Sequence, residues 1–273
     1  MEKAKIYLYI NNKFSSLKNI KITNFQNEEN LFSNGIFETF RTYQGKIFRQ
    51  DDHLKRFFAS AKALNLQVPL TFQKLKNALK KIINSCKFSE IRIRLSLSNY
   101  QNPVIIIICT PLSIFLQEIK ITTSSLRRKE IETENPRIKT LSCLNNILAL
   151  KDALNTNEVI MLNKNGFLAE GTYSNIFLVL ENILLTPHSC VGILKGITRD
   201  VICEIANELN IECKETFLTR YDLYNADECF ITCTTQGIIP VIEVDKRIIG
   251  NGKIGKITQK IMQKFIDKTL IEK

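Results

Sequence analysis

The spacing of the apolar residues changes at Asp51, and this change constrains the fold more than any other feature. Before it, residues 35–43 are rich in β-forming side chains and run into a Gln44-Gly45 turn, which predicts a strand and a hairpin. After it, apolar residues recur at helical spacing at Leu54, Phe57, Phe58, Ala61 and Leu64. The chain must therefore combine a sheet with amphipathic helices.

The first 110 residues form a consistent pattern of elements. Strands are predicted at residues 6–10, 35–43, 90–98 and 103–110, with a return strand at 46–48, and helices at 51–64 and about 71–86. The pair Asn11-Asn12 after the first strand is typical of a hairpin turn. The order β-β-α-α-β-β indicates a compact α+β domain.

The rest of the chain alternates between strand and helix patterns. Strands are predicted at 119–124, 159–162, 167–170, 176–180 and 228–232, and helices at 141–154, 197–209 and 254–265. Residues 164–166, Lys-Asn-Gly, predict a hairpin turn. This half is mixed α/β, and we expect an N-terminal domain at 1–112, a linker at 113–118 and a larger domain at 119–273.

Composition excludes several classes of protein. The longest apolar run, residues 104–109, is far shorter than the ~20 residues that cross a bilayer, and no signal-like segment opens the chain, so we expect a cytoplasmic protein without a membrane partner. The net charge of +11 comes from lysines spread along the chain, which argues against nucleic-acid binding. Eight cysteines without a CxxC pair, and only two histidines, predict reduced thiols and no metal site.

Three segments carry residue types that suggest chemistry. Glu170 ends an apolar strand just before Gly171, where a carboxylate could face a site or simply lie in a solvated turn. Gly196 opens a predicted helix with Thr198 in its first turn, where free N–H groups favour an anion. Residues 232–237, Thr-Cys-Thr-Thr-Gln-Gly, form a second run of hydroxyls; helix capping explains one such run, but two suggest a bound phosphate.

Lys139 precedes the helix expected near Leu141. A lysine at such a place is usually solvated, but an amine in a partly buried pocket can lose its proton and form a Schiff base with an aldehyde cofactor. The residues alone leave both interpretations open.

Taken in order, these motifs resemble the class IV aminotransferases, the fold-type IV pyridoxal-phosphate (PLP) family that includes branched-chain and D-amino-acid aminotransferases and 4-amino-4-deoxychorismate lyase. The matching segments are 35–41 (GIFETFR), 53–56 (HLKR), 138–149 around Lys139, 169–177 around Glu170, 194–199 (LKGITR) and 232–235 (TCTT). The resemblance covers nearly the whole chain and implies two domains with the active site between them.

The resemblance also implies roles for individual residues. Lys139 would bind PLP as a Schiff base, Arg56 would bind its phosphate, and Glu170 would pair with its ring nitrogen. The other cofactor-binding residues implied are Ser174, Asn175, Ile197, Thr198, Thr234 and Thr235. Phe37, Thr39 and Arg41 are the candidates for substrate binding. Family members are generally dimers with shared active sites, so we expect a homodimer acting on a small amino substrate.

The family member is harder to predict. The arginine and histidine of D-amino-acid aminotransferases, and the Tyr-x-Arg-Pro pattern of branched-chain enzymes, are missing after the 92–95 strand, where residues 96–102 read SLSNYQN. The strands at 37–41 and 91–98 look like aminodeoxychorismate lyases, so a lyase giving 4-aminobenzoate and pyruvate for folate synthesis is expected first. An aminotransferase for D- or branched-chain amino acids with 2-oxoglutarate is the alternative, and a noncatalytic basic binding protein is the third hypothesis.

Overall fold

The structure is a computed structural model that describes residues 5–10, 13–17, 35–86, 88–98, 103–114, 118–129, 134–153 and 156–271. The chain divides into two compact units. The first contains residues 1–113, 138–142 and 269–273, and the second contains residues 114–137 and 143–268. Residues 138–142 and 269–273 thus belong to the first unit, whereas the sequence predicted that everything after residue 118 would belong to the second domain.

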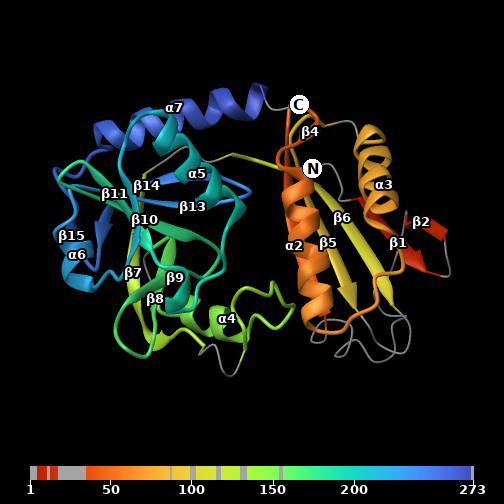
Figure 1. Cartoon of the computed structure of the whole chain (residues 1–273), viewed down its shortest axis with the longest axis horizontal. Helices are drawn as coiled ribbons and strands as arrows, with labels where there is room; N and C mark the ends of the chain where they lie inside the picture. Colours follow the sequence, from red (N-terminus) through yellow and green to blue (C-terminus); the bar gives the residue numbers. More distant parts are fainter. Residues whose placement is uncertain are drawn as a thin grey trace. The chain divides into compact units, whose positions relative to one another are not determined.

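The first unit is a six-stranded antiparallel sheet with two helices packed on one face (Figure 1). Its strand order is β2-β1-β6-β5-β3-β4. In chain order the elements are β1 (Lys5–Ile10), β2 (Lys13–Leu17), β3 (Gly35–Tyr43), β4 (Lys46–Ile47), α2 (Gln50–Ala63), α3 (Phe72–Asn84), β5 (Ile91–Ser98) and β6 (Val104–Pro111). The predicted α+β class is confirmed, while the Asn11-Asn12 turn lies outside the described residues.

Local chemistry explains where these elements begin and end. Gln44 and Gly45 both have positive φ, 50° and 80°, which is the backbone that a two-residue hairpin turn between β3 and β4 requires. Thr71 caps α3 by accepting a hydrogen bond from the backbone N–H of Lys74 at 3.3 Å. On β3, Ile36 and Phe40 are fully buried in the core shared with α2 and α3. Each such side chain stabilises the fold by roughly 1.5–3 kcal/mol.

The second unit is built on a nine-stranded mixed sheet with the order β12-β11-β10-β13-β14-β7-β8-β9, and β15 pairs with β14. Three of its pairs, β14 with β7, β7 with β8 and β11 with β12, are parallel. The elements are β7 (Ile119–Arg127), α4 (Leu144–Leu150), β8 (Glu158–Leu162), β9 (Leu168–Gly171), β10 (Asn175–Leu180), β11 (Ile183–Pro187), the short 3-10 helix η2 (Ser189–Val191), α5 (Ile197–Glu208), β12 (Cys213–Thr216), α6 (Arg220–Tyr224), β13 (Glu228–Cys233), β14 (Gly237–Val244), β15 (Arg247–Ile248) and α7 (Lys256–Ile271). The mixed α/β prediction is confirmed.

Some elements differ from the sequence prediction. Helix α4 covers only Leu144–Leu150 of the predicted 141–154. Leu141 donates its backbone N–H to the carbonyl of Gly35 instead of joining the helix, and residues 151–153 form i to i−3 turns. Strands β11, β12, β14 and β15 and helix α6 were not predicted. Within the described parts of the chain, no helix has both the length and the apolar character needed to span a bilayer.

Candidate active site

Lys139 lies in an extended segment that adds to the edge of β3. The backbone N–H of Phe37 donates to the carbonyl of Lys139 at 2.9 Å, and the N–H of Leu141 donates to the carbonyl of Gly35 at the same distance. The half-buried Lys139 side chain places Nζ 4.7 Å from the centroid of the Phe37 ring. Backbone pairing therefore holds this amine beside an aromatic surface.

Arg94, on the neighbouring strand β5, contacts the same ring. Its Cζ lies 3.8 Å from the Phe37 centroid, and Thr39 is its register partner across the β3–β5 pair. Side chains two apart on a strand share a face, so Phe37 and Thr39 point to the same side of the sheet. The structure thus brings two of the three predicted substrate residues together with Arg94, a guanidinium suited to binding a carboxylate.

Arg41, the third predicted substrate residue, is buried and paired with a carboxylate. Its side chain is 5% exposed, its Nε and Nη2 donate to Oε2 of Glu90 at 3.4 and 3.2 Å, and its Cζ lies 4.0 Å from the Tyr43 ring centroid. It is four residues along β3 from Phe37, about 13 Å at the usual rise of a strand. These contacts favour an ion-pair role for Arg41 and leave Arg94 as the better candidate.

Arg56 on α2 pairs with a fully buried carboxylate. Its Nε and Nη2 donate to Oε1 and Oε2 of Glu38 at 2.6 and 2.9 Å, and Nδ1 of His53 lies 2.9 Å from Oε2. Burial alone would raise the pKa of Glu38, but the charge of Arg56 and the His53 hydrogen bond outweigh it and lower this pKa to about 2. For His53 burial has the opposite sign: it disfavours the charged imidazolium and lowers the pKa.

This ion pair was not predicted from the sequence. Glu38 alternates with Phe37 and therefore points to the opposite, helix-covered face of the sheet. Because Glu38 holds two of the N–H groups of Arg56, it fixes the guanidinium in place. The predicted phosphate contact of Arg56 stays a prediction.

In the second unit, Glu170 ends β9 with its carboxylate surrounded by donors. Oε1 lies 2.8 Å from Nη2 of Arg128, and Oε2 accepts the backbone N–H of Leu194 at 2.9 Å. Nδ2 of Asn175 lies 3.4 Å from the same oxygen and donates to the Leu194 carbonyl at 2.9 Å. Glu170 is 5% exposed, so these donors offset the cost of burying its charge. The solvated-turn interpretation is excluded.

Arg128 is a further residue that the sequence did not indicate. Its Nη1 donates to Oδ1 of Asn146 at 3.0 Å, and Nδ2 of Asn146 donates to the Thr172 carbonyl at 2.6 Å. Asn146 belongs to α4, in the motif that follows Lys139. This chain of hydrogen bonds fixes the guanidinium that faces Glu170.

Ser174 contributes to the turn beside Glu170. Its Oγ donates to Oε2 of Glu158 at 3.0 Å, while Oε1 of Glu158 accepts the Thr172 N–H at 3.0 Å. All three residues are buried. The contacts of Ser174 shape the turn that carries Asn175, and a direct cofactor contact of Ser174 stays a prediction.

Helix α5 begins at the predicted anion-binding segment. Its N-cap, Gly196, makes no side-chain capping hydrogen bond, and Ile197 and Thr198 in the first turn are buried, at 8% and 6% exposed. A Cβ on Gly196 would lie 2.0 Å from Oδ1 of Asn175, so only glycine allows this close packing. First-turn N–H groups lack partners within a helix, which makes this end suited to an anion.

The hydroxyl run lies on strand β13 and the turn after it. Thr232 is the register partner of Asn175, so both side chains share a face of the sheet. Oγ1 of Thr232 is buried without a hydrogen-bond partner among the described residues. Thr234 and Thr235 are half-buried in the turn between β13 and β14. An unused buried hydroxyl next to Asn175, which itself packs on Gly196, fits a site for an anion such as a phosphate.

Residues 35–244 match the family described as "Amino-transferase class IV". The chain belongs to the class IV aminotransferases.

Two relatives and one solved structure illustrate the similarity of this aminotransferase to its family. It is 37% identical to the Methanocaldococcus jannaschii protein named "Putative branched-chain-amino-acid aminotransferase" over 275 residues, covering 95% of each chain. It is 29% identical to the D-alanine aminotransferase of Listeria monocytogenes, covering 87% of each. Among solved structures, the branched-chain aminotransferase of Thermoproteus uzoniensis with norvaline aligns with a TM-score of 0.87 and 29% identity, covering 97% of this chain and 95% of that one.

Class IV aminotransferases use PLP, and the residues of this aminotransferase fit that group. PLP carries an aldehyde, a ring nitrogen and a phosphate. The first unit offers the amine of Lys139, and the second offers the buried carboxylate of Glu170 and the helix start at Gly196 with the unused hydroxyl of Thr232. Among the described residues, no group of three or more His, Cys, Asp or Glu side chains could hold a metal ion.

Proposed function

We propose that this enzyme transfers the amino group of a branched-chain amino acid to 2-oxoglutarate. The observation that carries the proposal is the 37% identity, over 95% of both chains, to the M. jannaschii protein named "Putative branched-chain-amino-acid aminotransferase". The lyase reaction expected first from the sequence is less well supported, because the relatives reported above are named as aminotransferases. The strand resemblances at 37–41 and 91–98 therefore do not identify a lyase.

We assign proton transfer to Lys139. PLP, when bound, withdraws electrons from the α-carbon of the amino acid and so weakens its C–H bond. Lys139 would hold PLP through its Nζ, and the same amine, when free, would take the proton from the α-carbon of the amino acid. The pairing of its backbone with Phe37 and the contact of Nζ with the Phe37 ring keep the amine in place for both roles.

Glu170 would hold a proton on the ring nitrogen of bound PLP. A carboxylate in this role has to keep a fixed orientation and a negative charge, and Arg128 and the Leu194 N–H hold Glu170 on two sides. The phosphate would be held by the first-turn N–H groups of Ile197 and Thr198, with hydroxyls from Thr234 and Thr235 and the charge of Arg56. Thr232 joins this set on the evidence of its unpartnered Oγ1.

Arg94 binds the carboxylate of the amino acid. The guanidinium of Arg94 lies over the same Phe37 ring that Nζ of Lys139 contacts, so a carboxylate bound by Arg94 would lie near the reacting amine. Phe37 and Thr39 form the surface on which the substrate lies. The substitution Arg94→Leu removes the guanidinium and should raise KM for both the amino acid and the oxo acid by about tenfold to a hundredfold, since one charge-assisted contact is worth about 1.5–3 kcal/mol.

A paired assay tests the reaction. The purified enzyme is incubated with L-leucine and 2-oxoglutarate, and separately with 4-amino-4-deoxychorismate, and glutamate and 4-aminobenzoate are measured. We expect glutamate and no 4-aminobenzoate; 4-aminobenzoate without glutamate would restore the lyase interpretation. Lys139→Ala should abolish turnover, whereas Lys55→Ala, at a side chain 70% exposed on α2, should leave it unchanged. Turnover by Lys139→Ala equal to that of the control would contradict the assignment of Lys139.

A D-amino-acid aminotransferase is the second candidate, because the Listeria D-alanine enzyme covers 87% of the chain. The same assay with D-alanine in place of L-leucine distinguishes the two. Glutamate formation with D-alanine alone would favour this candidate over the branched-chain one.

We also propose that the protein is a homodimer. Three apolar residues on one face of α4, Leu144, Ile147 and Leu148, are 62%, 50% and 40% exposed, which is unusual for such side chains and typical of a contact surface. Light scattering should give twice the chain mass for the wild type. Ile147→Glu should shift the mass towards that of one chain, and a wild-type monomer at all concentrations would contradict the proposal.

A further inference from the structure

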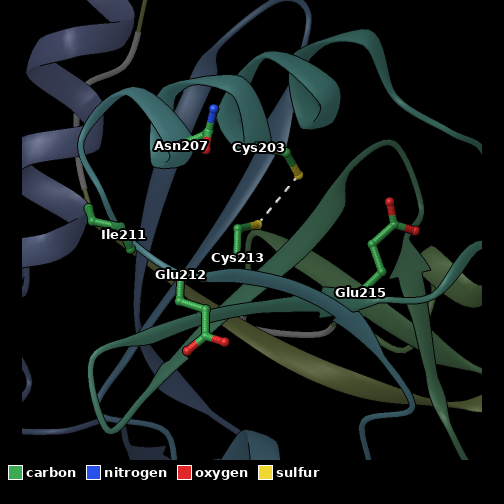
Figure 2. A pocket seen from close by; sticks show the side chains of 6 residues that line it. All are labelled: Cys203, Asn207, Ile211, Glu212, Cys213 and Glu215. Carbon is green, nitrogen blue, oxygen red and sulfur yellow. Dashed lines mark hydrogen bonds between the residues drawn. The ribbon is translucent and has the colours of Figure 1, made fainter.

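Two cysteines in the second unit face each other across the gap between a helix and a strand. Cys203 lies on α5 and Cys213 begins β12, and their Sγ atoms are 3.6 Å apart (Figure 2). A disulfide requires about 2.05 Å, so the sulfur atoms need to approach by only about 1.6 Å. Neither thiol is fully buried. The geometry is that of a reduced pair close to bond formation.

A buried arginine lies beside this pair. Arg199 is one helical turn before Cys203 on α5, is 0% exposed, and its Nη2 lies 3.0 Å from Oε2 of Glu215 on β12. The hydrogen bond with Cys203 and the charge of Arg199 both lower the pKa of Cys213, while the same hydrogen bond and burial raise the pKa of Cys203. One sulfur is thereby suited to attack and the other to remain a thiol.

The pair is open to small molecules. Cys203 and Cys213 line a cavity of about 370 Å³ together with Asn207, Ile211, Glu212 and Glu215 (Figure 2). Both glutamates are paired with cations, Glu212 with Lys214 at 2.7 Å and Glu215 with Arg199 at 3.0 Å. A small neutral reagent such as hydrogen peroxide can enter a cavity of this size.

We propose that Cys203 and Cys213 are a modification site at which hydrogen peroxide forms a reversible disulfide. The Cys213 thiolate attacks one oxygen of the peroxide, the O–O bond breaks, and hydroxide leaves and takes up a proton as water. Cys213 is then a sulfenic acid. The sulfur of Cys203 attacks that of Cys213, the S–O bond breaks, and a second water leaves as the S–S bond forms. The two sulfurs lose two electrons and the peroxide gains them.

A second pair of cysteines, Cys86 and Cys109 in the first unit, can be compared with Cys203 and Cys213. Cys86 and Cys109 also interact through their thiols, but burial and the neighbouring Cys86 raise the pKa of Cys109 to about 12. A thiol of that kind is almost wholly protonated at neutral pH and reacts slowly with peroxide. Cys190 is exposed, so random oxidation would reach it first.

The test uses the whole chain with PLP bound, fully reduced and freed of reductant. The protein is treated with hydrogen peroxide, denatured, alkylated and analysed by intact mass and peptide mapping. All eight cysteines of the reduced protein should take up the alkylating reagent, and two fewer after peroxide. One linked peptide pair should join Cys203 to Cys213, and dithiothreitol should restore full alkylation. Loss of thiols in the order of their exposure, beginning with Cys190, would overturn the proposal.

Three variants separate the two steps. In Cys213→Ser the remaining Cys203 thiol should be lost at least about tenfold more slowly than the pair in the wild type, because the attacking thiolate is gone. Cys203→Ser should leave a sulfenic acid at Cys213 that reacts with dimedone. The matched control Cys109→Ser should form the Cys203–Cys213 disulfide at the wild-type rate. Dimedone labelling of Cys203 in place of Cys213 would overturn the assignment of the attacking sulfur.

Discussion

Glu38 and Glu170 are both buried carboxylates paired with an arginine, yet their surroundings differ. Glu38, in the first unit, is 0% exposed and is held by Arg56 and His53, two side chains of the helix packed over its own sheet. Glu170, in the second unit, is held by Arg128 and by a backbone N–H just before α5. The first carboxylate joins a helix to a sheet, and the second lies at the end of a strand beside an uncapped helix start.

The comparison teaches that burial and an arginine partner do not by themselves identify a reacting carboxylate. Asn175, which contacts Glu170, is the register partner of Thr232, whose Oγ1 is buried without a hydrogen-bond partner among the described residues, and the N-cap of α5 makes no side-chain capping hydrogen bond. The carboxylate of Glu38 is instead saturated by side chains of its own unit. We therefore expect substitutions at Glu170 to affect catalysis and substitutions at Glu38 to affect stability.

The largest effect is expected from Glu170→Gln. The amide keeps the shape and the contact with Leu194 but cannot hold a proton on the ring nitrogen, so kcat should fall by about 10³-fold or more. Steady-state kinetics and thermal unfolding are measured together, with Glu158→Gln as the matched control for a buried carboxylate of the same unit. A fall in unfolding temperature without a fall in kcat would break the distinction between the two carboxylates.

The next effect is the loss of stability in Glu38→Gln. Removing the charge leaves Arg56 without its buried counter-ion, which typically costs about 3–4 kcal/mol of unfolding free energy. Urea unfolding of wild type and variant gives this value, and the kcat of the remaining folded protein should be close to wild type. A kcat reduced as strongly as in Glu170→Gln would mean that Glu38 also serves the reaction.

The unfolding free energies of the wild type and Glu38→Gln should also depend differently on pH. The folded pKa of Glu38, about 2, is below its ordinary value of 4.5, so its contribution to stability is complete above pH 4.5 and is lost as pH falls towards 2. The shift corresponds to about 3 kcal/mol. The difference in unfolding free energy between wild type and Glu38→Gln should therefore shrink steadily below pH 4.5. A difference that stays constant down to pH 2 would show that the charge of Glu38 is not responsible.

The smallest effect is expected from Arg56→Lys. The ammonium keeps the charge but cannot make the two parallel hydrogen bonds to Glu38, so stability should fall by about 1–2 kcal/mol. Thermal unfolding and PLP affinity are both measured. A weakened PLP affinity would support the predicted phosphate contact of Arg56, and an unchanged affinity with lower stability would restrict Arg56 to its pair with Glu38.

Local patterns were enough to predict most of the fold. The apolar spacing from Asp51 predicts α2, and the turn residues Gln44 and Gly45 predict the hairpin after β3. Strand β12, residues 213–216, has the polar sequence Cys-Lys-Glu-Thr and lies at the edge of its sheet, where little side-chain burial is needed. It was missed for that reason.

The site shows the same limit. The motifs around Lys139 and Glu170 were found because they are contiguous in sequence. Arg94 was missed because its significance depends on Phe37, more than fifty residues earlier, which becomes its neighbour only through the β3–β5 pair. Arg128 likewise gains its meaning from Glu170. Contacts between distant residues leave no local period for a sequence argument to detect.

The pairing of residues 138–142 with the edge of β3 has a consequence for the order of folding. During synthesis, the first 113 residues leave the ribosome before Lys139. Until residues 139–141 follow, the N–H of Phe37 and the carbonyl of Gly35 lack the hydrogen bonds that they make in the folded protein. In that interval the edge of β3 is open to pairing with another chain. A fragment that stops at residue 113 should therefore aggregate, whereas one that extends through Ser142 can cover this edge.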